Sequence, residues 1–242
     1  MNKDQINKKE SDMGAVSSEV IRKLNIFTNA KEETIEQLVK YAKVNQYKKG
    51  SYIFRDKEIV DQIYIVLHGK VSISKLGESG EGRVIFILDQ GQILNDHLKN
   101  QLPSAIDCIC FEKCEILSYP REWFLSMMEQ DFELTKSVLD QFCSKLRRTY
   151  RQLKNAPTNI AMERKLAAKI YRLYHDYGVK VEDGYLIDLP LTVSYLSQLL
   201  GAQRETVSRA FKKLVEADLV QYENKKIKIK SPEALGNYHK NK

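Results

Sequence analysis

The segment with the clearest chemistry is a run of polar residues that follows a glycine in the carboxy-terminal third of the chain. Gly201 ends an apolar, helix-spaced segment, and a second such segment begins about three residues later. Glycine can take the left-handed conformation that stops a helix, so the pattern predicts two short helices joined by a tight turn. In a helix-turn-helix the first turn of the second helix enters the DNA major groove. The side chains expected to face DNA are Gln203, Arg204, Glu205, Ser208, Arg209 and Lys212.

These residue types have the hydrogen-bonding groups that reading of bases requires. Arginine can donate two parallel hydrogen bonds to guanine O6 and N7, glutamate can accept one from cytosine N4, and serine can bond a base edge or a phosphate. Glu205 also lies four residues before Arg209, so the alternative is an ordinary salt bridge on the helix surface. The first interpretation predicts sequence-specific binding to double-stranded DNA, with Glu205 and Arg209 as the foremost base contacts.

A basic hairpin is expected directly after this pair of helices. Residues 221–230 suggest two short strands around a turn at Asn224, with lysine and isoleucine alternating in the second. Lysines on the outer face, namely Lys225, Lys226 and Lys228, could neutralise phosphates beside the groove. They could also protect an exposed sheet edge, and the two roles are compatible.

The charge distribution is consistent with an anionic partner for this part of the chain. The 242 residues carry a formal net charge of +7. Residues 157–242 hold 15 basic and 10 acidic residues, whereas residues 1–156 hold 24 and 22. No apolar run approaches the roughly 20 residues that span a membrane, and the charged amino terminus lacks the apolar core of a signal peptide. We therefore expect a cytoplasmic protein without a membrane partner.

Short strands separated by turns are predicted in the amino-terminal half of the chain, after two helices. Apolar periodicity indicates two helices between Glu19 and Ala42. Strand-like segments then alternate with glycine-containing turns between Gln46 and Tyr119, which is typical of an antiparallel sandwich or barrel that can enclose a small ligand. The expected strands are 52–54, 62–67, 71–74, 84–88, 106–111 and 115–119.

One long helix is expected between the strand region and the DNA-reading region. Apolar residues recur there at steps of three and four over about six turns. A seam of this length favours a second copy of the chain as its partner, and a two-fold dimer would place two recognition helices about one DNA turn apart. Packing against the chain's own strands is the alternative, and the seam could serve both. Its residues are Leu134, Val138, Phe142, Leu146, Thr149 and Leu153.

A proline marks the end of the long helix and the start of the second domain. Pro157 cannot continue the helix and biases Ala156 away from helical geometry, so we expect a hinge at Asn155-Ala156-Pro157. The expected organisation is a flexible arm at 1–18, a sensor domain with flanking helices at 19–132, the dimerisation helix and hinge at 133–156, and a DNA-binding domain at 157–242.

This order of elements, together with the run Arg204-Glu205-Thr206-Val207-Ser208-Arg209, closely resembles the Crp/Fnr superfamily of bacterial transcription regulators. Residues 49–54 (KGSYIF) and 63–71 (IYIVLHGKV) carry the resemblance in the strand region, so that it covers nearly the whole chain. It implies an α+β fold with an amino-terminal cyclic-nucleotide-binding-type β-roll (jelly roll), a long dimerisation helix and a carboxy-terminal winged helix-turn-helix. It also implies a homodimer on palindromic promoter DNA that commonly activates transcription by recruiting RNA polymerase.

The roll departs from the relatives that bind cyclic AMP. Those relatives carry a Gly-Glu pair and an Arg-Ser pair, because the cyclic phosphate needs an arginine and the ribose a carboxylate. Asn95-Asp96 and Pro103-Ser104 stand in these places here. Thr149 matches a position that contacts the nucleotide base, but Tyr150 replaces the next small hydroxyl. We therefore expect no binding of cyclic AMP and an unidentified small-molecule effector, if any, with pocket candidates Asn95, Asp96, Ser104, Thr149 and Tyr150.

Four cysteines offer a second kind of sensor chemistry. Oxygen-sensing relatives hold an iron-sulfur cluster mostly through cysteines near the amino terminus, where this chain has none, so we expect no such cluster. Cys108 and Cys110 lie two apart on an expected strand and face the same side, Cys114 follows across a turn, and Cys143 lies on the long helix. A thiol switch and a metal site are both open, but the spacing matches no standard zinc pattern, and buried core cysteines are the alternative.

Other classes of function have weaker support in the sequence. His97 lies near the expected pocket and His68 precedes a glycine turn, so haem remains a possible cofactor of a gas sensor. No nucleophile, acid-base pair or phosphate loop has persuasive spacing, and Gly77–Gly82 lacks the Lys-Ser/Thr ending of a nucleotide loop. A protein-interaction module would explain the roll and the seam but not Arg204, Glu205 and Arg209. We predict a regulator that is not an enzyme, with no metal site and no obligatory cofactor.

Overall fold

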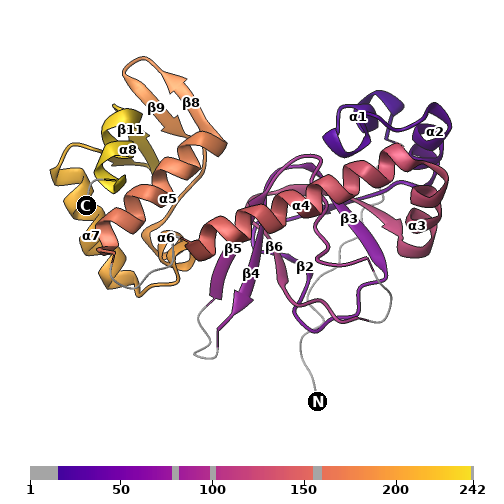
Figure 1. Cartoon of the computed structure of the whole chain (residues 1–242), viewed down its shortest axis with the longest axis horizontal. Helices are drawn as coiled ribbons and strands as arrows, with labels where there is room; N and C mark the ends of the chain where they lie inside the picture. The colour runs from indigo at the N-terminus through magenta and orange to yellow at the C-terminus, as the bar shows by residue number, and fades with distance from the viewer. Residues whose placement is uncertain (1–15, 78–81, 99–101, 155–159, 241–242) are drawn as a thin grey trace. The chain divides into compact units, whose positions relative to one another are not determined.

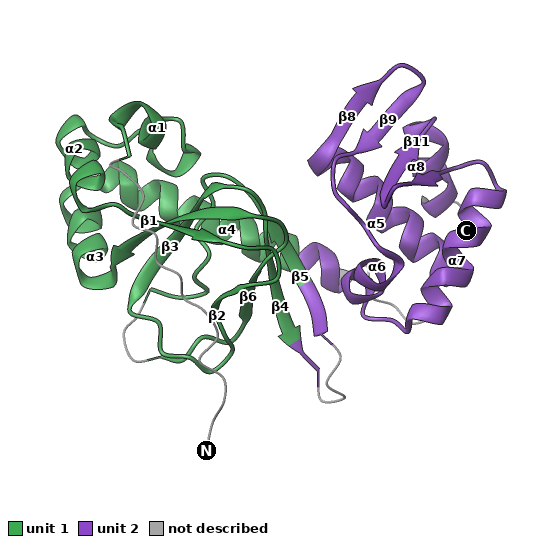
Figure 2. Ribbon diagram, turned by 180° about the vertical axis from the view of Figure 1, so that it is seen from behind, with its two compact units in different colours: residues 1–75, 85–149 green, residues 76–84, 150–242 purple. Residues whose placement is uncertain are grey.

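The computed structural model describes residues 16–77, 82–98, 102–154 and 160–240. It consists of two compact units, the first formed by residues 1–75 and 85–149 and the second by residues 76–84 and 150–242 (Figure 2). Most of the expected arm, the hinge at Asn155-Ala156-Pro157 and the middle of the glycine-rich turn lie outside the described residues. In the described ranges, no helix has the length and apolarity needed to cross a membrane.

Short helices open the first unit (Figure 1). They are α1 (Ser18–Arg22), the 3-10 helix η1 (Asn25–Phe27) and α2 (Glu32–Tyr41). Ser17 caps α1, because its side chain accepts a hydrogen bond from the Val20 N–H group. The helical region expected between Glu19 and Ala42 is confirmed, although the first helix ends at Arg22 and a 3-10 turn follows it.

Among the described residues, seven strands between positions 43 and 120 form the roll from two antiparallel sheets. One sheet has the order β1-β7-β3 and the other the order β2-β6-β4-β5. The six expected strands are confirmed to within a few residues at each end. The strand β1 is not among the predicted strands, because its residues are mostly polar. The bounds are β1 (Lys43–Tyr47), β2 (Tyr52–Phe54), β3 (Gln62–His68), β4 (Val71–Leu76), β5 (Gly82–Leu88), β6 (Asp107–Cys110) and β7 (Cys114–Pro120).

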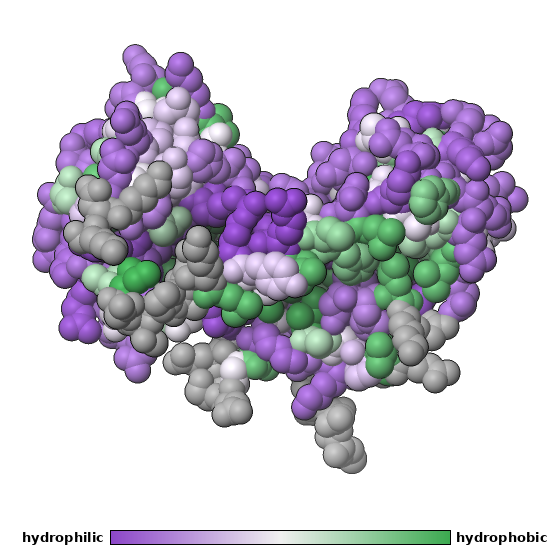
Figure 3. All heavy atoms as spheres, in the orientation of Figure 1, coloured by the Kyte–Doolittle hydropathy of each residue, from purple (hydrophilic) through white to green (hydrophobic). Residues whose placement is uncertain are grey.

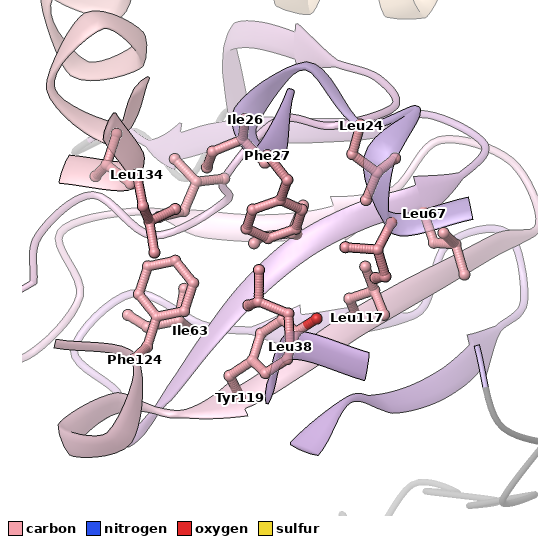
Figure 4. Close-up of a cluster of buried hydrophobic side chains, with 14 of the residues drawn as sticks. Leu24, Ile26, Phe27, Leu38, Ile63, Leu67, Leu117, Tyr119, Phe124 and Leu134 are labelled. Atoms are coloured by element: carbon pink, nitrogen blue, oxygen red, sulfur yellow. The ribbon is translucent and has the colours of Figure 1, made fainter. Parts of the chain in front are cut away.

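Two apolar clusters hold the first unit together. One joins the sheet β1-β7-β3 to the short helices, with Phe27, Leu38, Tyr119 and Phe124 among its largest side chains (Figure 4). The other contains residues from both sheets, including Phe54, Val66 and Phe86. Each large apolar side chain that is fully buried contributes about 1.5–3 kcal/mol to stability, so these clusters account for much of the folding free energy of the roll.

The long helix α4 (Phe132–Lys154) follows α3 (Arg121–Gln130) after the single residue Asp131. The buried Asp131 carboxylate accepts hydrogen bonds from the Glu133 and Leu134 N–H groups at 3.0 and 3.3 Å, which caps α4. It also accepts one from the Lys31 N–H group at 2.7 Å, ahead of α2. One carboxylate therefore fixes the start of α4 and ties it to the amino-terminal helices.

The predicted seam of α4 divides into two parts. Leu134 and Val138 are fully buried in the first cluster, whereas Leu146 and Leu153 are 49% and 67% exposed. The exposed residues belong to a stripe along α4 whose successive members are alternately four and three residues apart. We call it the α4 stripe: Leu139, Cys143, Leu146, Tyr150 and Leu153. Figure 3 shows a hydrophobic band over this helix. The helix thus packs against its own roll at its start and, within the described residues, keeps an exposed coiled-coil-type face further along.

In its described part, the second unit combines four helices with a four-stranded sheet of order β10-β11-β9-β8. The expected packing helix, helix pair and basic hairpin are confirmed. The hairpin β8-β9 and the last helix were not expected, although Asp183-Gly184 is a hairpin turn signal. The bounds are α5 (Met162–Tyr177), β8 (Gly178–Val181), β9 (Gly184–Ile187), α6 (Val193–Leu200), α7 (Arg204–Glu216), β10 (Gln221–Glu223), β11 (Lys226–Ile229) and α8 (Pro232–Lys240).

Candidate nucleic-acid interface

The helices α6 and α7 form the predicted helix-turn-helix. Thr192 caps α6 by accepting a hydrogen bond from the Tyr195 N–H group at 3.1 Å. Gly201 ends α6 in the left-handed conformation, with φ of 61°. The Ala202 N–H group then donates to the Ser197 carbonyl at 3.1 Å, and α7 begins at Arg204. The glycine therefore makes the short turn that the sequence predicts.

One face of α7 is buried and the opposite face is exposed. Val207, Ala210, Phe211 and Leu214 are buried in the second unit. The six predicted DNA-facing residues are all exposed: Gln203, Arg204, Glu205, Ser208, Arg209 and Lys212. In the part of the chain that the structure describes, Glu205 and Arg209 form no ion pair with each other, whereas Lys212 lies 3.6 Å from Glu216. The charged groups on the first turn of α7 are therefore available to an external ligand.

The basic hairpin β10-β11 is held by an aromatic contact with α7 and by a hydrogen bond to the segment before α6. The Tyr222 ring meets the Phe211 ring edge-on at a centroid distance of 5.2 Å. The Tyr222 hydroxyl donates to the Leu191 carbonyl at 2.8 Å. Asn224 and Lys225 both have positive φ, as the two central residues of a tight hairpin turn require. The hairpin thus has the position of a wing beside the recognition helix.

The wing lysines differ in their partners, which the sequence did not reveal. Lys226 pairs with Asp188 at 2.9 Å, and Lys228 pairs with Asp183. Both carboxylates come from the β9 side of the sheet, about 40 residues earlier in the chain. Among the described residues, exposed Lys225 at the turn forms no ion pair. A phosphate would therefore meet Lys225 directly but compete with carboxylates at Lys226 and Lys228.

Three effector candidates bond to other parts of the roll. Asn95 is buried; its side chain accepts from the Tyr64 N–H group and donates to the Gln62 carbonyl, at 2.8 and 2.9 Å. Asp96 accepts from the Ala105 N–H group at 2.8 Å, and the Ser104 hydroxyl donates to the Ile106 carbonyl at 3.0 Å. These side chains thus brace the segment between β5 and β6. Whether they also bind an effector stays a prediction.

The two candidates on α4 have different surroundings. The Thr149 hydroxyl donates to the Lys145 carbonyl one turn earlier at 3.1 Å, which is a local bond within the helix. Tyr150 is 58% exposed and belongs to the α4 stripe. Thr149 is thus not held by the roll through a hydrogen bond that the structure shows, and its role in a pocket also stays a prediction.

Two side chains on α4 hold this helix to the roll by hydrogen bonds, and the sequence did not indicate either of them. The Gln141 amide donates to the Gly91 carbonyl at 2.7 Å and accepts from the Ile93 N–H group at 2.9 Å. The Lys145 ammonium donates to the Ile93 and Asn95 carbonyls at 2.6 and 3.3 Å. The bonds join residues about 50 apart, so no local sequence signal could have identified them.

The burial of Lys145 predicts that the stability of the folded protein changes with pH in a characteristic way. Burial lowers the pKa of the Lys145 ammonium to about 8, with Arg148 acting in the same direction and Cys108 and Asp96 opposing it. The unfolded chain keeps this proton up to about pH 10.4, so between these values it binds more protons than the folded protein. The contribution of Lys145 to stability should therefore rise with pH, by up to about 3 kcal/mol.

Urea unfolding of the wild type and Lys145→Met at pH 7, 8, 9 and 10 tests this expectation. The difference in unfolding free energy, wild type minus variant, should increase across the series. Using the difference removes most of the contribution of the cysteines, whose thiols titrate in this range in the unfolded chain. A difference that is constant with pH would show that Lys145 has an ordinary pKa.

Three of the four cysteines lie together inside the roll. Cys108, Cys110 and Cys114 are buried, and Cys143 is exposed on α4. The Cys114 thiol donates to the Lys70 and Glu112 carbonyls at 3.1 and 3.3 Å. Interaction with the Cys114 thiol and burial raise the pKa of Cys110, and interaction with the Cys110 thiol lowers that of Cys114. Burial raises the pKa of Cys108. Cys114 is therefore the thiol of the pair that ionises first.

The histidines named as haem candidates have unlike environments. The His97 Nδ1 atom lies 2.8 Å from an Asp96 carboxylate oxygen, and its buried Nε2 atom has no hydrogen-bond partner among the described residues. His68 is exposed and lies 4.0 Å from Glu115. Within the described ranges, no group of three or more His, Cys, Asp or Glu residues could hold a metal ion. Haem therefore stays an alternative, and the prediction of no obligatory cofactor stays a prediction.

Family comparisons match both units of the chain. A cyclic nucleotide-binding domain model matches residues 44–131, and a Crp-like helix-turn-helix domain model matches residues 164–238. The global nitrogen regulator of Synechococcus elongatus is 25% identical over 195 residues, which cover 79% of this chain and 87% of the relative. The CRP-like cAMP-activated global transcriptional regulator of Mycobacterium tuberculosis is 22% identical over 218 residues, which cover 90% and 97%.

The fold also matches solved structures. A CooA mutant from Carboxydothermus hydrogenoformans superimposes with a TM-score of 0.74 at 18% identity, over 89% of this chain and 94% of that chain. The matched domains occur in the predicted order, with the exposed face of α7 inside the helix-turn-helix match. The chain therefore belongs to the Crp/Fnr superfamily of helix-turn-helix transcription regulators, with a cyclic nucleotide-binding-type β-roll followed by a Crp-like DNA-binding domain.

Proposed function

We propose that the protein is a homodimeric regulator that binds a palindromic promoter site and is controlled by a signal other than cyclic AMP at its roll. The observation that carries the proposal is the exposed face of α7, where Arg204, Glu205, Ser208 and Arg209 have no role in the domain's core. Arginine and glutamate on the first turn of a recognition helix are suited to guanine and cytosine edges. Activation through RNA polymerase is the outcome we expect, by analogy with the family.

The α4 stripe supports the homodimer. Five exposed residues spaced as the core positions of a coiled coil need a partner helix, and a second α4 offers an identical face. A parallel pair of α4 helices would carry both DNA-binding units at the same end. That arrangement fits adjacent half-sites of one palindrome.

Selection of bound sequences from a random duplex library by the purified protein tests the function. We expect enrichment of a two-fold palindrome, and the binding should weaken steeply with salt because lysines and arginines displace counterions from the phosphates. A selection that enriches no sequence, with or without reductant, would refute the proposal and favour a protein-interaction module.

The ion pairs of the wing lysines predict that Asp183 and Asp188 lower the affinity for DNA. The double variant Asp183→Asn, Asp188→Asn should bind the selected site a few-fold more tightly, because Lys226 and Lys228 would no longer share their charge with carboxylates. Asp176→Asn, on α5, is the matched control because Asp176 pairs with Arg172 instead. Fluorescence anisotropy at several salt concentrations measures the effect. Equal affinity of double variant and wild type would mean that these lysines do not contact phosphate.

Cyclic AMP should not bind, although the cyclic nucleotide-binding model matches the roll. Pro103 and Ser104 occupy the place of the phosphate-binding Arg-Ser pair, so the phosphate would lack its counter-charge. The Asn95 amide is already engaged with the backbone of β3. Calorimetric titration should show no saturable heat up to millimolar nucleotide, and the DNA affinity should be unchanged. Tight saturable binding would disprove this part of the proposal.

A second candidate signal is thiol oxidation, favoured by the free cysteines Cys110 and Cys114, which are buried in the same cluster of the roll. Loss of two protons and two electrons to a disulfide oxidant would join the two thiols. Their strands β6 and β7 belong to different sheets of the roll, so the bond would link the sheets. DNA affinity that changes on oxidation in the wild type, but not after replacing Cys110 or Cys114 with serine, would support it. Unchanged affinity in the oxidised wild type would exclude it.

A further inference from the structure

A polar cavity lies along α4, outside the packed interior of the roll. Its volume is about 300 Å³, at the lower end of the range for small-ligand sites. The wall is formed by α4, η1 and the turn after β5. Ile26 is its single apolar lining residue among those described, so the cavity has no surface for stacking a nucleobase or burying a haem.

The charges in the cavity are arranged along the helix. Asp140, Ser144 and Arg148 follow one another at steps of four residues on one face of α4, and Lys145 lies beside Arg148. At 1.5 Å per residue, the backbone positions of Asp140 and Arg148 are about 12 Å apart. The Arg148 guanidinium lies 4.9 Å from the centre of the Phe86 ring, which positions it against the roll. The cavity thus has a cationic end and an anionic end.

Neutral polar groups fill the space between the two ends. Asn25 and Asn29 line the cavity on the η1 side, and Ser144 lines it on α4 between Asp140 and Arg148. The Lys145 ammonium uses two of its three N–H groups for the carbonyls of Ile93 and Asn95, which leaves one donor. Hydrogen-bonding groups of this kind suit a hydrophilic ligand rather than an apolar one.

We propose that this cavity binds a small polar metabolite with one anionic group, which Arg148 and Lys145 hold, and with hydroxyl or amino donors that face Asp140. Carboxylate and phosphate share the chemistry that the cationic end recognises. Asp140 disfavours a second negative charge at the other end of the ligand. The inference rests on the proposed function, because it names the chemical class of the signal.

The cavity is well placed to act on α4. Gln141 and Lys145, which line it, also hold α4 to residues 91–95 of the roll. Gly91 approaches Asn25 so closely that a Cβ atom at Gly91 would lie 2.5 Å from the Asn25 Oδ1 atom, so this junction has little freedom. A ligand that bridges η1 and α4 would therefore stabilise one placement of the helix that carries the α4 stripe. By linkage, the ligand and DNA should alter each other's affinity by the same factor.

Calorimetry of the full-length protein with three related sugars tests the assignment. Glucose 6-phosphate and gluconate carry the two kinds of anion, and glucose is the neutral control. We expect saturable binding of at least one anion and none of glucose. Arg148→Gln should weaken that binding at least ten-fold, and Ser144→Leu, which fills the cavity, should abolish it. Arg151→Gln, on the same helix but outside the cavity, should leave it unchanged.

Several results would overturn the assignment. The first is that neither anion binds at about 10 mM. The second is that Arg148→Gln and Ser144→Leu, with unchanged thermal unfolding, bind the anion as tightly as the wild type does. The third is that inorganic phosphate binds as tightly as the sugar anions. The DNA affinity of the same preparations separates the two levels of the argument. Specific DNA binding without anion binding refutes the cavity assignment alone, whereas absence of specific DNA binding refutes the proposed function.

Discussion

Replacing Arg209 with alanine should weaken binding to the selected palindrome by about 1–3 kcal/mol for each half-site and relax the base preference at one position. The guanidinium is exposed on the first turns of α7 and is not neutralised by Glu205. A bidentate contact to guanine would lose both hydrogen bonds and leave the base edge unpaired in the complex. Anisotropy titrations on the palindrome and on its single-base variants measure affinity and preference together.

The pattern of the loss distinguishes two roles for Arg209. Equal loss on every sequence would make it a phosphate anchor, whereas loss confined to the preferred base pair identifies a base contact. Arg172→Ala is the matched control, because Arg172 is a surface arginine of the same unit that pairs with Asp176 on α5. The control should change neither affinity nor preference. Full affinity and unchanged preference in Arg209→Ala would contradict the proposed reading helix.

Replacing Leu146 with glutamate should separate the dimer and lower DNA affinity by about a hundred-fold or more. Leu146 lies in the middle of the α4 stripe and is 49% exposed in the single chain. In a two-fold pair of helices, two glutamates would face each other in an apolar seam, where an unpaired charge is costly. A monomer binds one half-site only and loses the effective concentration that links the two recognition helices.

Light scattering coupled to size exclusion measures the mass of Leu146→Glu, and anisotropy on full and half palindromes measures its affinity. Arg151→Gln, on another face of α4, should remain dimeric and bind as the wild type does. The isolated variant should keep its fold, since Leu146 is not part of either apolar cluster of the roll. A variant that stays dimeric would place the subunit contact elsewhere.

The helix-turn-helix could be predicted from the sequence because its signals are local. Thr192, Gly201 and the 3.6-residue spacing of apolar residues set the ends and the buried faces of α6 and α7 within a stretch of about 25 residues. The exposed positions of α7 then follow from helix geometry alone. The β8-β9 hairpin has a comparable local signal at Asp183-Gly184, a dipeptide typical of tight hairpin turns.

The sensor region was predictable as strands but not as a site. The family pattern points to Asn95, Asp96 and Ser104, and the structure shows that their side chains bond to the roll itself. The polar cavity beside α4 was not anticipated, because it joins η1, the turn after β5 and α4 across more than 100 residues. Residue type alone does not show which polar groups a fold will satisfy internally.

The sequence by itself thus determined the order of most elements, the turn at Gly201, the outward side chains of α7 and the family. Only the tertiary structure decided that Leu134 and Val138 serve the roll while Leu146 and Leu153 stay exposed, and that Asp183 and Asp188 pair with the wing lysines. The physical reason is the range of the interactions. Capping, turn geometry and amphipathic spacing act within a few residues, whereas burial and ion pairing depend on segments that only folding brings together.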